Sequence, residues 1–259
     1  MRIAIVTQDE PFYLPTFLEH VAKSRRKDIV AMIILKPFNK NLPENVKRVY
    51  NLYGPYDFLI YSIRFILLKA QDFLTRFLPF SGVWSVEGVA RRHGIPVYRP
   101  DNINAPAFLA VLSKVIQPDI IVSVAASQIF KKNILSLPRY GCINIHTAPL
   151  PRYRGMLPTF WVLLNREKET AVTVHYMTEK LDDGDIICQE PVAILPEDTL
   201  DSLIRRTKRI GAEVLLKALD DIEQGKVFRK PNDASKATYF SFPTREDARK
   251  FRALGLKFR

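Results

Sequence analysis

The sequence predicts an open, mostly parallel α/β sheet with helices on both faces. Apolar, β-branched runs alternate with helical patterns through the first two hundred residues. Strands covered on both faces read as nearly continuous apolar runs, and their alternation with helices is typical of a parallel sheet. The 259 residues are enough for one large domain, or for a domain with an appendage.

The expected strands are short runs of β-branched and other apolar residues, which favour extended backbone. They cover residues 2–6, 29–35, 96–98, 119–125, 142–146, 171–177 and 185–194. A further edge strand is expected over 238–242. In an open parallel sheet, ligands bind beyond the carboxyl ends of the strands, and His146 stands at such an end.

The expected helices have apolar residues three or four apart and end at recognisable stop signals. Thr244, followed by Asp247 three residues later, resembles a capping box that opens a short basic helix. The other helices are expected over residues 14–23, 84–93, 105–116, 158–165 and 199–225.

A further amphipathic helix is expected over residues 58–78. Its apolar residues recur at helical spacing, but Arg64, Lys69, Asp72 and Arg76 interrupt them. A span of a bilayer needs about 20 mostly apolar residues, so no transmembrane segment is predicted. The helix is expected to pack on the domain or on a second subunit, as in a homodimer; an interfacial membrane helix and a mobile lid are the alternatives.

No glycine-rich turn follows the first expected strand, since the earliest glycine in the sequence is Gly54. The dinucleotide fingerprint and the phosphate-cradling loop both need glycine there, because the backbone approaches the phosphates closely. A nicotinamide or flavin dehydrogenase is therefore not expected.

The composition predicts a cytoplasmic protein without a structural metal. Met1 leads directly into a strand, so no signal peptide is expected. Cys142 and Cys188 fall in expected strands and are interpreted as reduced core thiols. The four histidines form no cluster with cysteine, and no metal is predicted.

The net charge of +12 is unevenly distributed. Residues 229–259 contain nine Lys or Arg against three Asp or Glu, so this segment is expected to form a basic C-terminal tail. Residues 1–228 are expected to form the catalytic domain, with the amphipathic helix inserted at 57–78. A basic balance indicates an anionic partner: nucleic acid, a phosphorylated small molecule or an anionic membrane.

The segment from Gly141 to Asp185 carries the predicted chemistry. Asn144 and His146 are two apart on a strand, so their side chains leave the same face while Ile143 and Ile145 point into a core. Asp182 follows the next strand on a turn. Together they provide a hydrogen-bond donor, a base and an orienting carboxylate. Each residue alone also fits an ordinary role in a turn or core.

Two blocks in this segment resemble a known family. The first runs from Gly141 to His146 and continues over Pro149-Leu150-Pro151-Arg152-Tyr153-Arg154-Gly155; the second runs from Val172 to Met177 and on to Leu181-Asp182-Asp183-Gly184-Asp185. In sequence, order and separation they resemble the signature of the folate-dependent formyltransferases. The similarity extends from about 86 to 194, is weaker at the amino end and is lost after about 225. It implies a Rossmann-like formyltransferase fold with a short C-terminal extension.

The resemblance implies that Asn144, His146 and Asp182 are a catalytic trio. N10-formyltetrahydrofolate is then the co-substrate, and its formyl group passes to a primary amine without a metal. Asn144 and a protonated His146 are expected to donate hydrogen bonds to the oxyanion, and Asp182 to favour the imidazolium. His175, on the second strand, is interpreted as structural or supporting.

The family's pterin pocket, which is formed largely by backbone, corresponds here to two segments. The cofactor-binding residues implied are Gln128, Ile129, Phe130, Leu135, Thr178 and Glu179. Arg152, Tyr153 and Arg154 are candidates to bind the acceptor, because guanidinium groups near the site can grip a phosphate; solvated loop charges are the alternative.

The acceptor expected from the resemblance is a nucleotide-linked amino sugar, formylated for a surface polysaccharide. Glycinamide ribonucleotide enzymes have a glycine-rich phosphate loop that this chain lacks. Methionyl-tRNA enzymes carry a large C-terminal barrel, and about thirty residues are too few for one. A compact methionyl-tRNA formyltransferase, with tRNA held by the basic tail, is the first alternative. A non-catalytic domain that binds folate or nucleic acid is the second.

Overall fold

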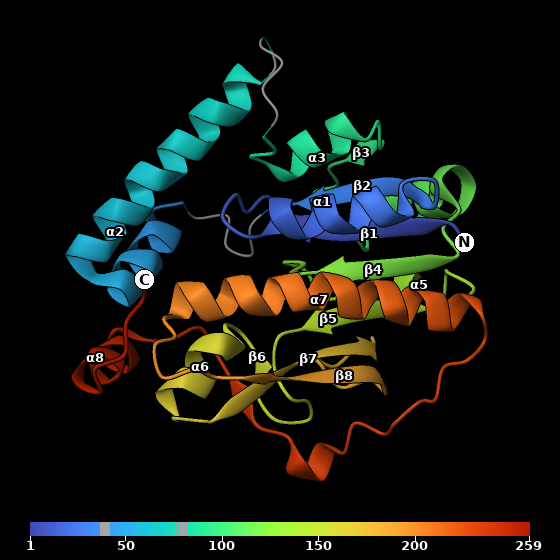
Figure 1. Cartoon of the computed structure of the whole chain (residues 1–259). Helices are drawn as coiled ribbons and strands as arrows, with labels where there is room; N and C mark the ends of the chain where they lie inside the picture. The colour runs from blue at the N-terminus through green and yellow to red at the C-terminus, as the bar shows by residue number, and fades with distance from the viewer. Residues whose placement is uncertain (37–41, 76, 78–81) are drawn as a thin grey trace.

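The computed structural model describes residues 1–36, 42–75, 77 and 82–259, and its centre is one seven-stranded sheet. The strand order is β3-β2-β1-β4-β5-β7-β8 (Figure 1), in which the first five strands are parallel and the last two pair antiparallel. Their bounds are Ile3–Gln8 (β1), Ile29–Leu35 (β2), Val97–Tyr98 (β3), Ile120–Val124 (β4), Cys142–His146 (β5), Glu169–Tyr176 (β7) and Ile186–Ala193 (β8). The predicted open, mostly parallel sheet is confirmed.

Helices cover both faces of the sheet because the strands are apolar on both sides. On β1, Ile3 and Ile5 join one buried cluster, while Ala4 and Val6 join another. The first cluster is completed by α1 (Leu14–Arg25), α3 (Val86–Arg92), α6 (Pro158–Leu164), α7 (Leu200–Glu223) and α8 (Arg245–Ala253). The second is completed by α4 (Pro106–Val111), its continuation η1 (Leu112–Ile116) and α5 (Lys132–Leu135).

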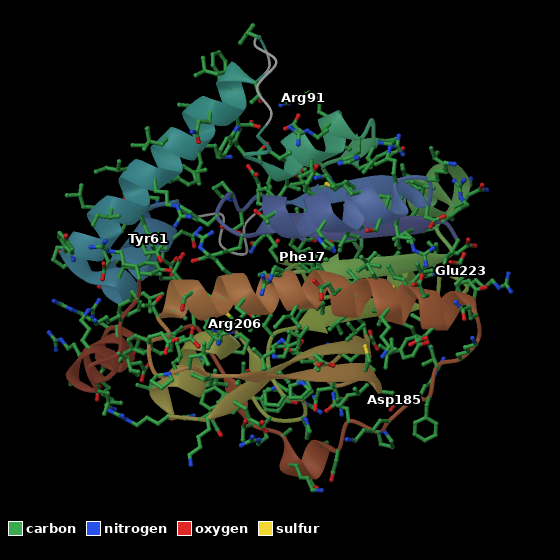
Figure 2. The ribbon with its side chains drawn as sticks, in the orientation of Figure 1. Phe17, Tyr61, Arg91, Asp185, Arg206 and Glu223 are labelled. Carbon is green, nitrogen blue, oxygen red and sulfur yellow. The ribbon has the colours of Figure 1, made fainter. Side chains whose placement is uncertain are left out.

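The helices α1 and α7 lie side by side on the first face (Figure 2). Phe17 of α1, 2% exposed, belongs to the same buried cluster as Leu215 of α7. At the end of α1, Arg25 donates to Glu223 across a distance of 2.8 Å. Burial of an aromatic side chain stabilises such a contact by about 1.5–3 kcal/mol, so it fixes the two helices more firmly than the exposed ion pair does.

The helix expected from residue 58 begins earlier than predicted, because α2 covers Leu42–Leu74. It has two parts joined at Gly54, whose φ of 67° and ψ of 175° are not helical, and Pro55 opens the second part. The N–H of the first residue of a helix has no partner within the helix, so proline is tolerated there. Pro55 therefore fits the start of the second part, directly after the break at Gly54. Residues 76 and 78 of the predicted helix lie outside the described residues. The far half of α2 stands away from the sheet (Figure 1), and no described helix is apolar enough over its length to cross a membrane.

The C-terminal residues fold back on the domain. After the turn η2 (Ala234–Lys236), strand β9 (Tyr239–Phe240) pairs with β6 (Arg154–Gly155) in a separate two-stranded sheet. The strand expected over 238–242 therefore exists over Tyr239–Phe240, and it lies in this small sheet and not in the main one. The expected capping box of α8 is confirmed, with Thr244 and Asp247 bonded reciprocally.

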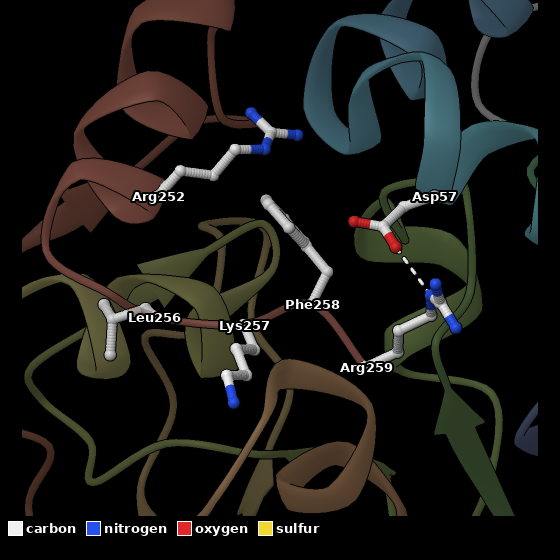
Figure 3. Close-up of a pocket in the computed structure, with 6 residues that line it drawn as sticks. All are labelled: Asp57, Arg252, Leu256, Lys257, Phe258 and Arg259. Atoms are coloured by element: carbon white, nitrogen blue, oxygen red, sulfur yellow. Dashed lines mark hydrogen bonds and ion pairs between the residues drawn. The ribbon is translucent and has the colours of Figure 1, made fainter.

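The last residues of the chain pack against the base of α2. Phe258 is buried, and Arg259 donates to Asp57 at 2.6 Å. A cavity of about 320 Å³ lies here (Figure 3), lined by Asp57, Arg252, Leu256, Lys257, Phe258 and Arg259. None of these residues belongs to the segment that carries the predicted chemistry, so we do not connect this cavity with catalysis.

Candidate active site

Strand β5 positions Asn144 and His146 on one face, as the alternation of the strand predicts. Ile143 and Ile145 belong to the apolar cluster on the opposite face, whereas Cys142 shares the face of Asn144 and His146. His146 is buried and Asn144 is half-buried. Asn144 is therefore the more accessible of the two at this end of the sheet.

Asp182 meets both residues from the turn that follows β7. Its Oδ2 lies 3.7 Å from His146 Nδ1, and its Oδ1 lies 3.4 Å from Asn144 Nδ2. The backbone of Asp182 has a φ of 50°, in the left-handed region that aspartate tolerates in turns. The structure thus brings together three residues that are up to 38 positions apart in the sequence.

The hydrogen bonds of His146 define the role of each ring nitrogen. Nε2 lies 2.8 Å from the carbonyl oxygen of Tyr153, so it carries a proton and donates to that oxygen. Nδ1 is then the nitrogen that faces Asp182. Any proton that His146 gains or loses in this arrangement is held at Nδ1.

His175 orients the amide of Asn144. Its Nδ1 donates to the carbonyl oxygen of Tyr176 at 2.7 Å, so in the neutral ring Nε2 is an acceptor. Nε2 lies 3.2 Å from Asn144 Nδ2, which donates to it. The interpretation of His175 as a supporting residue agrees with this geometry, since it touches Asn144 directly.

The pKa of Asp182 is well below its usual range. Burial by itself raises the pKa of this carboxyl group, but the charge of His146, the ring of His175 3.7 Å away and the backbone N–H of Gly155 outweigh that effect. Gly155 N donates to Asp182 Oδ2 at 2.9 Å. Asp182 is therefore a carboxylate at neutral pH and faces His146 with a full negative charge.

A buried arginine ties this turn to the C-terminal segment. Arg154 is fully buried and donates to Asp183, to the hydroxyl of Tyr239 at 2.8 Å and to Asn232 Oδ1 at 2.9 Å. Asn232 in turn donates to the carbonyl oxygens of Asp182 and Gly184, at 2.9 and 3.1 Å. Sequence reasoning missed Asn232, because it lies about fifty residues from the turn that it holds and no local pattern marks it.

The three residues expected to bind the acceptor have different surroundings. Arg152 is half exposed and pairs with Glu167 at 3.0 Å, while the hydroxyl of the buried Tyr153 donates to the same carboxylate at 2.7 Å. The guanidinium of Arg154 is 0% exposed. Its burial does not fit the predicted contact with a phosphate, because the side chain has no exposed surface on which a phosphate could bind.

The residues expected to bind the cofactor lie in two segments that touch each other. Lys132 N donates to Glu179 at 3.1 Å, which joins the segment after β4 to the segment after β7. Ile129 is 56% exposed, whereas Phe130 is buried and Leu135 packs against the second cluster. The amide of Gln128 bonds to the backbone of Asp101 and Ile103, and Thr178 Oγ1 accepts from the Lys180 N–H. Of the six residues expected to bind the cofactor, Ile129 is the one with a large exposed apolar side chain that could contact a flat ring.

No group of His, Cys, Asp or Glu in the described residues is arranged to hold a metal ion. His146 and His175 each have a ring nitrogen 3.7 Å from Asp182, and all three residues also bond to backbone groups.

Replacing Gly155 with Ala is expected to lower the free energy of unfolding by at least about 2 kcal/mol. Gly155 has a φ of 103°, and an added Cβ would lie 2.1 Å from the Phe240 carbonyl oxygen. Urea unfolding measures the loss. Gly225→Ala is the matched control, since Gly225 has a φ of 67° with open space around it. If both variants lose the same stability, the close packing of β6 on β9 contributes nothing.

Known proteins resemble this chain in sequence and in fold. The methionyl-tRNA formyltransferase of Syntrophus aciditrophicus is 43% identical over 162 residues, which are 62% of this chain and 52% of that protein. The chain thus spans about half the length of the curated relatives it matches. The formyltransferase PseJ from Anoxybacillus kamchatkensis is 25% identical with a TM-score of 0.51, over 63% of this chain and 82% of that one.

A sugar N-formyltransferase from Shewanella sp FDAARGOS_354 has the same fold, with a TM-score of 0.59 at 18% identity over 98% of this chain and 88% of that one. A model of the formyl transferase family matches residues 81–219, which is more than half of the 259 residues and includes Asn144, His146 and Asp182. The chain therefore belongs to the formyl transferase family.

Proposed function

We propose that this protein transfers a formyl group from N10-formyltetrahydrofolate to a primary amine, and that the amine is that of methionyl-tRNA. The observation that carries the proposal is the meeting of Asn144, His146 and Asp182 at one end of the sheet, with His146 Nδ1 3.7 Å from an ionised carboxylate. An amide donor, an imidazole and a carboxylate are the groups that acyl transfer to an amine requires.

The segments around Ile129 and Glu179 are the proposed place of the folate. The side chain of Ile129 is 56% exposed and offers an apolar surface to a ring, and the hydrogen bond between Lys132 and Glu179 holds the two segments together. PseJ was crystallised with tetrahydrofolate, which supports the choice of donor. Bound there, the folate supplies the activated formyl group.

Asn144 is proposed to stabilise the negative charge that develops on the formyl oxygen by a hydrogen bond, and His146 by its positive charge when Nδ1 is protonated. Asn144 Nδ2 already donates to His175, and its contact with Asp182 is the longer one, at 3.4 Å. A developing oxyanion can replace that weaker contact without moving the side chain. A preorganised donor of this kind contributes about 2.7–4 kcal/mol to lowering the barrier.

Asp182 and His146 are proposed to transfer the proton that the acceptor amine loses to the folate nitrogen. The amine nitrogen forms a bond to the formyl carbon, the bond from that carbon to the folate nitrogen breaks, and one proton passes from the amine to that nitrogen. The carboxylate of Asp182 stabilises positive charge on His146, so Nδ1 can hold the proton between the two nitrogens. The hydrogen bond from Nε2 to Tyr153 keeps the ring in this orientation.

The acceptor expected from the sequence, an amino sugar, receives less support than the tRNA alternative. The relatives with about 40% identity are methionyl-tRNA formyltransferases, and a net charge of +12 suits a polyanionic substrate. A nucleotide-linked amino sugar remains the second candidate, because PseJ was crystallised with a UDP-linked 4-formamido sugar.

A comparison of acceptors tests the proposal. We expect kcat/KM for charged initiator tRNA to exceed that for UDP- and dTDP-linked amino sugars, and to fall steeply as salt rises, because tRNA binding releases counterions. Tetrahydrofolate release gives the rates, and the Asp182→Asn protein serves as the blank. Turnover with an amino sugar and none with tRNA would establish the second candidate instead.

A further inference from the structure

The outer face of α2 carries an apolar stripe that the described part of the chain leaves exposed. Five of its side chains are between 49% and 68% exposed: Tyr56, Leu59, Ile63, Ile66 and Phe73; Phe77, beyond the end of the helix at Leu74, is 70% exposed. Leu67 and Leu74, at 57% and 44%, widen the stripe. Large side chains that are each about half exposed offer on the order of 800 Å² here, which exceeds the patches of about 300–600 Å² found on typical monomers.

The opposite face of α2 is fixed to the domain. Asp57 pairs with Arg259 at 2.6 Å at the base, and Lys69 pairs with Asp9 at 2.7 Å further along. Ser85 Oγ donates to Asp72 at 2.5 Å near the far end. The helix is therefore held along its length in an orientation that turns the stripe away from the sheet.

The spacing of the stripe is that of a seam between helices. Its members alternate by three and four residues through Tyr56, Leu59, Ile63, Ile66, Ala70 and Phe73, and Phe77 continues the series. Within α2 the series runs from Tyr56 to Phe73, more than two heptads, and a repeat of 3.5 residues keeps an apolar edge in line with a partner helix. We propose that this stripe is the interface between two copies of the chain, with the two α2 helices antiparallel around a two-fold axis.

The stripe is complementary to itself when two copies pair antiparallel. When the two-fold axis passes between Ile66 and Leu67, Leu59 meets Leu74 of the second copy, and Ile63 meets Ala70. The large Ile63 is thus placed over the small Ala70, and apolar residues meet apolar residues along the helix. An isologous interface requires this kind of self-complementarity.

Area and charge both favour a second copy as the occupant. A standard interface buries about 800 Å² on each partner, which is the area that the stripe offers. A helix lying on an anionic membrane needs basic side chains beside its apolar face. Between positions 55 and 77 the sequence has three basic residues, Arg64, Lys69 and Arg76, and the first two pair with carboxylates of the domain, Asp201 and Asp9.

Sedimentation of the full chain tests the proposal. We expect the wild type to be a dimer at micromolar concentrations, and Ile66→Glu to raise its dissociation constant by at least about a hundredfold, because two carboxylates then meet at the axis. Phe228→Glu is the matched control: it places the same charge on a side chain that is 85% exposed outside the stripe, and the dimer should persist. A monomeric wild type, or equal dissociation of both variants, would overturn the proposal.

Cysteine cross-linking tests the register. In a Cys188→Ala background, Leu59→Cys and Leu74→Cys proteins should form a disulfide when mixed, and neither should form one alone. Self-cross-linking of each variant would indicate a parallel pair and contradict the two-fold arrangement. Binding of monomers to vesicles of anionic phospholipid, lost in Ile66→Glu, would show that a membrane covers the stripe instead.

Discussion

Replacing His146 with Ala is expected to lower the turnover of formyl transfer by about 10²–10⁴-fold, the range that a positioned acid or base contributes. The variant removes the imidazole of β5 whose Nδ1 lies 3.7 Å from the Oδ2 of Asp182. The binding of folate should change little, because the proposed folate segments lie after β4 and β7. Steady-state kinetics should therefore show a loss in kcat rather than a rise in the KM for folate.

The matched control is His20→Ala, since His20 is exposed on α1 and lies outside the site. It should keep wild-type kinetics. Thermal unfolding of both variants separates a catalytic effect from a loss of fold, because His146→Ala also loses the bond to Tyr153. A folded His146→Ala protein with wild-type turnover would contradict the proposed mechanism.

Replacing Arg154 with Ala is expected to lower the free energy of unfolding by about 3–5 kcal/mol, the cost of breaking a buried ion pair by removing one partner. Arg154 is fully buried and bonds to Asp183, Tyr239 and Asn232. Its loss leaves a carboxylate without its partner and detaches β9 from the turn that carries the site. Urea unfolding measures this effect, and turnover should fall with it.

Arg152→Ala controls for the loss of an arginine two residues away. Arg152 is half exposed and pairs with Glu167, so its removal should cost less than about 1 kcal/mol. Arg154→Lys should not restore stability, because a single ammonium group cannot replace a planar guanidinium that bonds to three residues. If Arg152→Ala and Arg154→Ala were equally stable, the link from the C-terminal segment to the site would not matter to the fold.

The parts of the fold that local patterns specify were predictable from the sequence. The strands over 29–35 and 142–146 were predicted with the bounds that the structure shows, because short segments rich in isoleucine and other apolar residues are ended by turns on both sides. The side of β5 on which Asn144 and His146 lie follows from the period of two. The capping box at Thr244 was visible for the same reason, since the two residues that form it are three apart.

Contacts between distant segments could not be predicted. Nothing near Arg154 or Gly155 in the sequence indicates that this short strand pairs with Tyr239 and Phe240, more than eighty residues later. Arg154 looked like a phosphate ligand because it stands in a charged loop, and its burial depends on this pairing. The early start of α2 was missed because Gly54 and Pro55 look like a helix boundary, whereas the chain is helical on both sides of them.

The identity of the acceptor could not be predicted from the residues of the site. The amino-sugar prediction rested on the missing glycine-rich loop and on the small number of residues after α7, yet about 160 residues of the chain are 43% and 40% identical to two methionyl-tRNA formyltransferases. The three proposed catalytic residues act on the formyl group and not on the rest of the acceptor. Their geometry therefore supports the reaction without choosing between tRNA and sugar.

The transfer of the formyl carbon itself is the most direct test of the proposed function. N10-formyltetrahydrofolate labelled in the formyl carbon would be incubated with the protein and with methionyl-tRNA or a nucleotide-linked amino sugar, and the acceptor analysed by mass spectrometry. We predict that the label appears on the primary amine, in an amount equal to the tetrahydrofolate released, and that Asp182→Asn abolishes it. Binding of the folate without transfer of the label to either acceptor would contradict the proposal.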